Sequence, residues 1–273
     1  MKLLGVDIGF SEKRRSTAIA CLNGDELTVW LARTDFESRT FKIPDGFCAS
    51  VVALDGPLLP SASQETIRRP CEEAFVRAPF HKRCKPRLSH CGAGLKLRDA
   101  TAIACTQFSR FVEISEQRVS GVTRNGPIIE AFPNAFLGVL TPEPTMQLAP
   151  IFKRGRRFDW LYDTAVTSSN VESKLSKQLD LPDEVWSRLR MEKHHERRAA
   201  LICLLTAAVA ARGTATVVGE AAGGWFWLPP WSSWEPWAKE GLQKVLSEIG
   251  KTALLSAPCV SSGHKPFFGT GEP

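Results

Sequence analysis

The stretch LLGVDIG, residues 3–9, decides the fold that we predict for this chain. Its apolar half is typical of a short buried strand, and the acid and the Ile-Gly pair that follow end the strand and turn the chain. The same pattern recurs in SVVALDGP, residues 50–57, and in PIIEAFP, residues 127–133. Because such strands precede helical stretches, they indicate an α/β fold around a mixed sheet.

The remaining elements are predicted from periodicity and turn residues. An Asn23-Gly24 pair between two apolar runs is a strong hairpin signal. Residues 237–249 carry apolar side chains at helical spacing, which predicts an amphipathic helix. The other expected elements are strands at Ser16–Leu22, Leu27–Leu31 and Thr216–Val218, helices over 100–116 and 192–212, short helices and loop over 56–98, and several helical pieces over 134–190.

Three acids stand at the ends of the predicted strands, namely Asp7, Asp55 and Glu130. In open α/β sheets, ligands bind at the carboxyl ends of the strands. Three carboxylates gathered there would repel one another and take up protons unless a cation compensates them. Hard oxygen ligands suit Mg²⁺ or Mn²⁺, and two such ions can support phosphodiester cleavage. For each acid alone, the alternative is an ordinary helix cap or turn former.

A fourth ligand is expected where the helix predicted after residue 192 begins with His194-His195-Glu196. Its polar front could face a site at the sheet edge, with Glu196 as the ligand and His195 as a ligand or proton shuttle. The alternative is a solvated first turn, in which the helix dipole favours a Glu. The predicted catalytic centre therefore contains Asp7, Asp55, Glu130, Glu196 and His195, of which the four acids are the predicted metal ligands.

Basic residues exceed acidic ones by 35 to 29, a net charge of +6 that permits a polyanionic partner without requiring one. They cluster within residues 68–98 and 153–157. Clustered Lys and Arg can contact phosphates, although a solvated surface is the simpler interpretation. The residues predicted to bind substrate are Arg69, Lys96, Arg98, Lys153 and Arg157.

Two further clusters each allow two interpretations. Residues 225–237 hold five of the eight tryptophans, which could stack on unpaired bases but are more simply read as packed loop. His81, Cys84, His90 and Cys91 are residue types that bind zinc. Because their spacing matches no common zinc pattern, loop packing or phosphate contact is the preferred interpretation.

Length and composition place the chain among ordinary globular proteins. Its 273 residues suffice for one large domain or two small ones, and no segment reads as a linker between domains. The longest nearly apolar run, Ala199 to Ala211, is shorter than the roughly 20 residues that span a bilayer. The first residues do not form a signal peptide. We therefore expect a soluble, cytoplasmic protein with no membrane partner.

The chain resembles the family of predicted ribonuclease H-like nucleases known as domain of unknown function 429. This resemblance implies a ribonuclease H-like fold over residues 1–250, with insertions at about 60–120 and 134–190 and a tail over 251–273. It also implies an acidic, metal-binding centre at Asp7, Asp55 and Glu130. The matching segments are GVDIG (5–9), ALDGPLLP (53–60), RRPCEEA (68–74), GLKLRDA (94–100), IIEAFPNAFL (128–137), FKRGRRFDWL (152–161), HHERRAALICLLTAA (194–208) and GEAAGGWFWLPP (219–230).

The sequence departs from the family pattern in two places. Where the family's late helix carries two acids, this chain has Glu196 and then Ala199. Where the family has Arg-x-x-Asp after the second strand acid, this chain has Arg69 and Glu72. Loss of a ligand at Ala199 could weaken a second metal site or abolish hydrolysis.

The prediction is thus a metal-dependent nuclease that acts on nucleic acid through Mg²⁺ or Mn²⁺ held by carboxylates. The alternative is a nucleic-acid-binding or scaffold protein that keeps the fold and has lost the chemistry. An actin-like phosphotransferase is a third possibility, because such proteins also begin with Asp-Ile-Gly and a hairpin. They normally need two such domains, and this chain has a single Asp-Ile-Gly.

Overall fold

The computed structural model describes residues 1–59, 69–82, 84–86, 88–112, 127–143, 156–167, 170–220, 223–250 and 255–256. Within these ranges the strands are β1 (Lys2–Asp7), β2 (Thr17–Asn23), β3 (Glu26–Ala32), β4 (Val51–Asp55), β5 (Ile128–Ala131), β6 (Thr216–Glu220), β7 (Gly224–Leu228) and β8 (Leu255–Ser256). The helices are α1 (Phe36–Thr40), α2 (Pro70–Val76), α3 (Ala93–Phe108), α4 (Pro133–Gly138), α6 (Arg156–Thr167), α7 (Asn170–Leu179), α8 (Asp183–Met191), α9 (His195–Ala211) and α10 (Pro236–Glu248).

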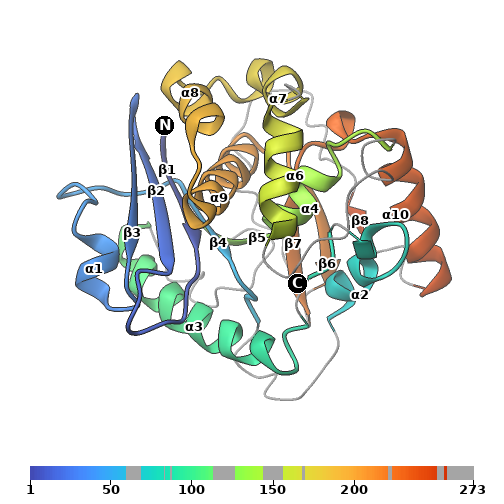
Figure 1. The fold of residues 1–273 in the computed structure, drawn as a ribbon, viewed down its shortest axis with the longest axis horizontal. Coiled ribbons are helices and arrows are strands. Elements are labelled where there is room, and N and C mark those ends of the chain that lie inside the picture. The colour runs from blue at the N-terminus through green and yellow to red at the C-terminus, as the bar shows by residue number, and fades with distance from the viewer. Residues whose placement is uncertain are drawn as a thin grey trace, which may run out of the picture.

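All eight of these strands belong to one mixed sheet, in the order β3-β2-β1-β4-β5-β7-β6-β8. The first three strands pair antiparallel as a meander, whereas β4 lies parallel to β1 and β5 lies parallel to β4. β7 is parallel to β5, and β6 is antiparallel to its neighbours β7 and β8. Figure 1 shows the meander at one end of the molecule and β6 with α10 at the other. The predicted α/β class with a mixed sheet is therefore confirmed.

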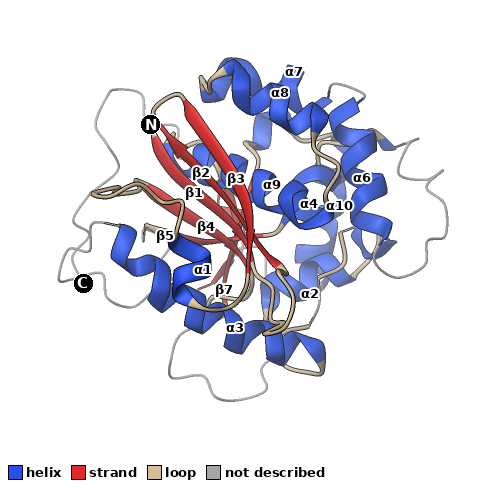
Figure 2. Ribbon diagram, turned by 60° about the vertical axis from the view of Figure 1, so that its left-hand side comes forward, coloured by secondary structure: helices blue, strands red, loops and turns tan. Residues whose placement is uncertain are grey.

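Helices cover both faces of this sheet. On one side α1 and α3 lie against the meander and β4, and on the other α9 lies across β1, β2 and β4 with α4 and α6 beside it (Figure 2). Two apolar clusters match these layers: one surrounds α9, and the other joins Val6 and Leu54 to Phe108 of α3. α9 is apolar around almost its whole circumference, as a helix buried between a sheet and other helices must be.

The structure differs from the expected elements at two informative places. The hairpin turn consists of Gly24 and Asp25, because Asn23 still pairs with Glu26. Residues 224–228, which we expected to be loop, form β7 with alternating burial. Their tryptophans mask a period-two pattern in which Gly224, Phe226 and Leu228 are the buried positions.

None of the helices in the described ranges combines the length and the apolar content that crossing a membrane requires.

Candidate active site

Asp7 and Asp55 lie side by side at the carboxyl ends of two neighbouring strands. They are the last residues of β1 and β4, and their Cα atoms are partners in the parallel register. Residues paired in this way point to the same face of a sheet. That face is the one covered by α9, because Gly5, two residues before Asp7 on β1, lies directly under the backbone of α9 at Ala200 and Leu204. The predicted juxtaposition of these two acids is confirmed.

Glu130 does not join them on that face. It is the third of four residues in β5, where it pairs with Leu54, and Ala131 is the partner of Asp55. Because side chains alternate along a strand, Glu130 points to the opposite face from Asp55. Both of its carboxylate oxygens accept hydrogen bonds there, Oε1 from Arg69 Nη1 at 2.9 Å and Oε2 from Leu58 N at 2.9 Å and Arg69 Nη2 at 2.5 Å.

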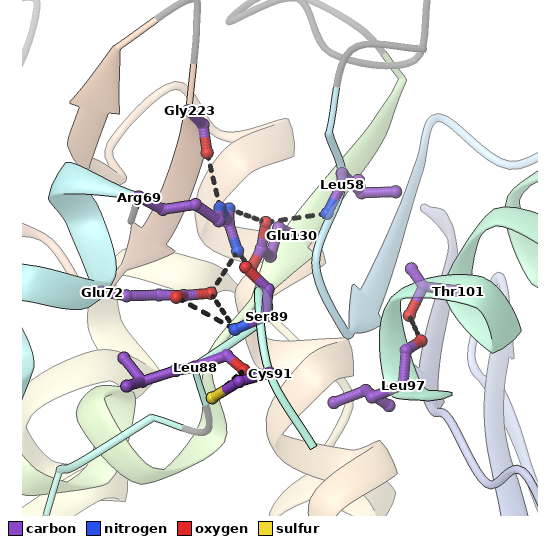
Figure 3. Close-up of polar contacts among 10 residues, drawn as sticks. All are labelled: Leu58, Arg69, Glu72, Leu88, Ser89, Cys91, Leu97, Thr101, Glu130 and Gly223. Atoms are coloured by element: carbon purple, nitrogen blue, oxygen red, sulfur yellow. Dashed lines mark hydrogen bonds and ion pairs between the residues drawn. The ribbon is translucent and has the colours of Figure 1, made fainter. Parts of the chain in front are cut away.

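Arg69 is the centre of a buried polar network rather than a surface contact (Figure 3). Its side chain is 1% exposed, and besides Glu130 it donates to Glu72 Oε1 at 3.1 Å and to Gly223 O at 2.5 Å. Glu72 in turn accepts from Ser89 N. The network joins α2 to β5 and to the loops around residues 58, 89 and 223. This corrects the prediction that Arg69 contacts substrate phosphate, because its guanidinium is enclosed by protein partners.

Burial has an electrostatic cost in this network. Burial raises the pKa of the Glu130 carboxyl, and the Arg69 guanidinium opposes that rise. The ion pair with Arg69 thus favours the charged form of Glu130, which burial disfavours. Loss of either side chain would leave the other as a buried charge without its partner.

α9 brings the predicted fourth ligand to the Asp7–Asp55 side of the sheet. A Cβ atom added to Gly5 would stand 2.1 Å from the backbone nitrogen of Leu204 and 2.4 Å from the carbonyl oxygen of Ala200, so glycine allows the helix to lie directly on β1. The N-terminal turn of α9 then reaches the cleft at the strand ends, where Glu196 and His195 line it together with Asp7 and Asp55. Glu196 is partly exposed and contacts His194 Nδ1 at 3.0 Å.

His195 is held by residues that the sequence analysis did not single out. Its Nδ1 lies 3.1 Å from Asp159 Oδ2 in α6, and Asp159 Oδ1 lies 3.3 Å from Nη1 of the buried Arg198. Arg198 also donates to Asp163 Oδ1 at 2.7 Å and to the carbonyl oxygen of Glu192 at 2.9 Å. The spacing of Asp159 and Asp163 places both on one helical face, but no local pattern indicates that α9 supplies their partner.

One cleft of about 970 Å³ at the carboxyl end of the sheet is lined by Asp7, Asp55, His195 and Glu196. Its acids are Asp7, Asp55, Glu72, Glu130 and Glu196. Among the described residues, Arg14, Lys85 and Arg157 are the basic ones that line it, and of these only Arg157 was predicted to bind substrate. Among the other predicted contacts, Lys96 and Arg98 lie on α3 outside the cleft lining, and Lys153 lies outside the described residues.

The loop between β1 and β2 forms one rim of the cleft. Its base is pinned by a hydrogen bond from Gly9 N to Thr17 Oγ1 at 3.2 Å, and the buried Arg39 donates to both Gly9 O and Thr17 Oγ1 at 3.3 Å. Phe10 follows at once and remains 43% exposed while lining the cleft. An exposed aromatic ring in the cleft that Asp7 also lines is suited to stacking on a flat ligand group.

Both ambiguous clusters lie within the described residues. Trp234 is buried and donates to Pro229 O, and Trp237 donates to Thr141 O, while none of the five tryptophans lines the cleft. Nor do His81, Cys84, His90 and Cys91 form a metal site: in the described part of the chain, no three His, Cys, Asp or Glu side chains are arranged to hold a metal ion.

Comparison of the chain with protein-family models, with curated proteins and with solved structures found no match.

Proposed function

We propose that this protein is a metal-dependent phosphodiesterase of ribonuclease H-like fold that cleaves nucleic acid. The mixed sheet with helices on both faces is compatible with the fold that the sequence resemblance implies. The observation that carries the proposal is the pairing of Asp7 with Asp55 at the carboxyl ends of adjacent parallel strands, in a cleft that also takes Glu196 and His195.

The donor chemistry of this pair fits Mg²⁺ or Mn²⁺. Mg²⁺ is commonly bound through one or two carboxylates, with waters and substrate phosphates completing its shell, so a preformed cage of three or more ligands is not required. We assign Asp7 and Asp55 as the ligands, with Glu196 as the third acid of the same cleft. Glu130 is left out of this set because Arg69 and Leu58 N occupy its oxygens. The ion, when bound, would supply Lewis-acid stabilisation of charge on the phosphate.

The remaining cleft residues act on the substrate and on the attacking water. Arg14, Lys85 and Arg157 offer positive charge to the phosphate backbone, and Phe10 offers a ring on which an unpaired base can stack. His195 accepts a proton from the water whose oxygen forms the new bond to phosphorus. The bond from phosphorus to the leaving sugar oxygen breaks, and that oxygen takes a proton from solvent.

A metal titration combined with a cleavage assay tests the proposal. We expect Mn²⁺ to raise the melting temperature of the wild-type protein, since a ligand at 100 times its Kd stabilises by about 2.7 kcal/mol. Asp7→Asn and Asp55→Asn should lose both this shift and the cleavage of labelled single-stranded RNA or DNA. Asp45→Asn, an exposed acid outside the cleft lining, is the control. Cleavage at the wild-type rate by Asp7→Asn would refute the assignment.

The second candidate is a non-hydrolytic nucleic-acid-binding protein. Ala199, which replaces an acid of the family pattern, lines the cleft itself, so the position that would hold a further ligand carries a methyl group. This candidate predicts that labelled nucleic acid binds while Mn²⁺ leaves the melting temperature unchanged and no product forms.

A further inference from the structure

The geometry points to Asp159 as a positioning residue that fixes which nitrogen of His195 carries the proton. Asp159 lies on α6 and His195 on the first turn of α9, and the two side chains meet at 3.1 Å between Oδ2 and Nδ1. A carboxylate can only accept a hydrogen bond, so the proton of this contact stands on Nδ1. In the neutral ring, Nε2 is then the nitrogen with the lone pair.

His195 lines the cleft and is 43% exposed, so the ring reaches solvent and substrate. The imidazole and the Phe158 ring pack edge to face with their centroids 5.3 Å apart, which restricts rotation of the imidazole. Because Nδ1 is hydrogen-bonded to Asp159, Nε2 is the ring nitrogen that can act on a substrate in the cleft. An Asp that orients a His in this way commonly sets its tautomer.

Arg198 fixes the orientation of the Asp159 carboxylate. It is 5% exposed, stacks over the Tyr162 ring at 4.7 Å, and donates through Nη1 to the other oxygen of Asp159. An arginine has donors only and cannot accept a hydrogen bond. One edge of Asp159 therefore faces a permanent donor, and the opposite edge faces His195.

This arrangement predicts an inverted tautomer in Asp159→Asn. The new amide must turn its oxygen toward Arg198, because two donors cannot pair, and its NH₂ group then faces His195 Nδ1. Nδ1 has to accept that hydrogen bond, which moves the ring proton to Nε2 and removes the lone pair from the cleft. Asp163→Asn is the matched control, because Asp163 lies one turn further along α6 and also accepts a hydrogen bond from Arg198, at 2.7 Å.

The experiment measures the tautomer directly by long-range ¹H–¹⁵N NMR at a pH where the ring is neutral, with the His195 signals assigned from their loss in His195→Gln. We expect Nδ1–H in the wild type and in Asp163→Asn, and Nε2–H in Asp159→Asn. An unchanged tautomer in Asp159→Asn would overturn the inference. Thermal unfolding of the three variants shows that each remains folded.

The kinetic arm rests on the proposed function. In Mn²⁺-dependent cleavage, Asp159→Asn should lower kcat about 10- to 100-fold with KM unchanged, as for other residues that orient a catalytic His. Asp163→Asn should retain the wild-type kcat, and an equal loss in both variants would reduce Asp159 to a structural partner of Arg198. If the wild-type protein cleaves no nucleic acid, the proposed function fails, and the NMR measurement still decides the role of Asp159.

Discussion

At the scale of single residues, Arg69 and Glu130 form an ion pair that is buried in the protein. Both side chains are almost fully buried, at 1% and 4% exposure, and the contact is bidentate. Removing one member of a buried pair leaves an uncompensated charge, which costs much more than the pair contributes when intact. Arg69 therefore holds in place two acids that line the cleft, Glu72 and Glu130.

We predict that Arg69→Met lowers the free energy of unfolding by about 3–5 kcal/mol, measured by urea denaturation, because Glu130 and Glu72 would remain buried without their cation. The double variant Arg69→Met with Glu130→Leu should recover part of this loss.

The control for this prediction is the exposed pair between Arg33 and Asp35, whose atoms lie 3.4 Å apart. Arg33→Met should cost no more than about 1 kcal/mol, as is usual for surface ion pairs. Equal losses in Arg69→Met and Arg33→Met would show that the buried network does not stabilise the fold.

At the scale of elements, the approach of α9 to β1 decides where the helical part of the site lies. The helix backbone passes directly over Gly5, so any larger residue there would push the helix away from the sheet. The same helix begins with His195 and Glu196, and it buries Cys203 where the charges of Asp7 and Asp55 help to raise the pKa of its thiol. The close packing of α9 on Gly5 thus positions His195 and Glu196, which lie more than a hundred residues further along the sequence.

We predict that Gly5→Ala destabilises the protein by about 3 kcal/mol, the upper end for overpacked cores, because the obstructing atoms are backbone and cannot rotate away. It should also weaken the response of the melting temperature to Mn²⁺. Gly250→Ala is the control: its φ of 66° is left-handed, but nothing lies within 4 Å of the added methyl group, so only about 1 kcal/mol is expected. A smaller loss for Gly5→Ala than for Gly250→Ala would contradict the close packing.

At the scale of the whole molecule, the cleft is lined by acids at the strand ends and by basic residues from the segments around them. Arg14 comes from the loop after β1, Lys85 from the loop before α3, and Arg157 from the first turn of α6. Three distant segments thus present positive charge to one opening. Such an arrangement is suited to holding a polyanion over an acidic centre.

We predict that Arg157→Gln weakens binding of single-stranded nucleic acid and lowers the slope of log K against log salt by about 0.7, the value for one lost phosphate contact. Fluorescence anisotropy across a salt series measures both quantities. Lys96→Gln is the control, because Lys96 is exposed on α3 outside the cleft lining. Equal effects of the two substitutions would mean that the cleft is not the binding surface.

The amino-acid sequence by itself determined the features that depend on neighbouring residues. The strands of the meander, β4 and β5, the apolar helix α9 and the acids near the strand ends all follow from local periodicity and turn residues. The juxtaposition of Asp7 with Asp55 could also be predicted, because both end parallel buried strands.

Only the tertiary structure decided which side chains meet. Glu130 lies one residue before the end of β5, so its side chain points to the face opposite that of Asp55. There it accepts a hydrogen bond from Arg69. The contact of Asp159 with His195 depends on how α6 packs beside α9. Register and helix packing arise from pairing between segments far apart in the chain, and a local pattern carries no information about a partner that distant.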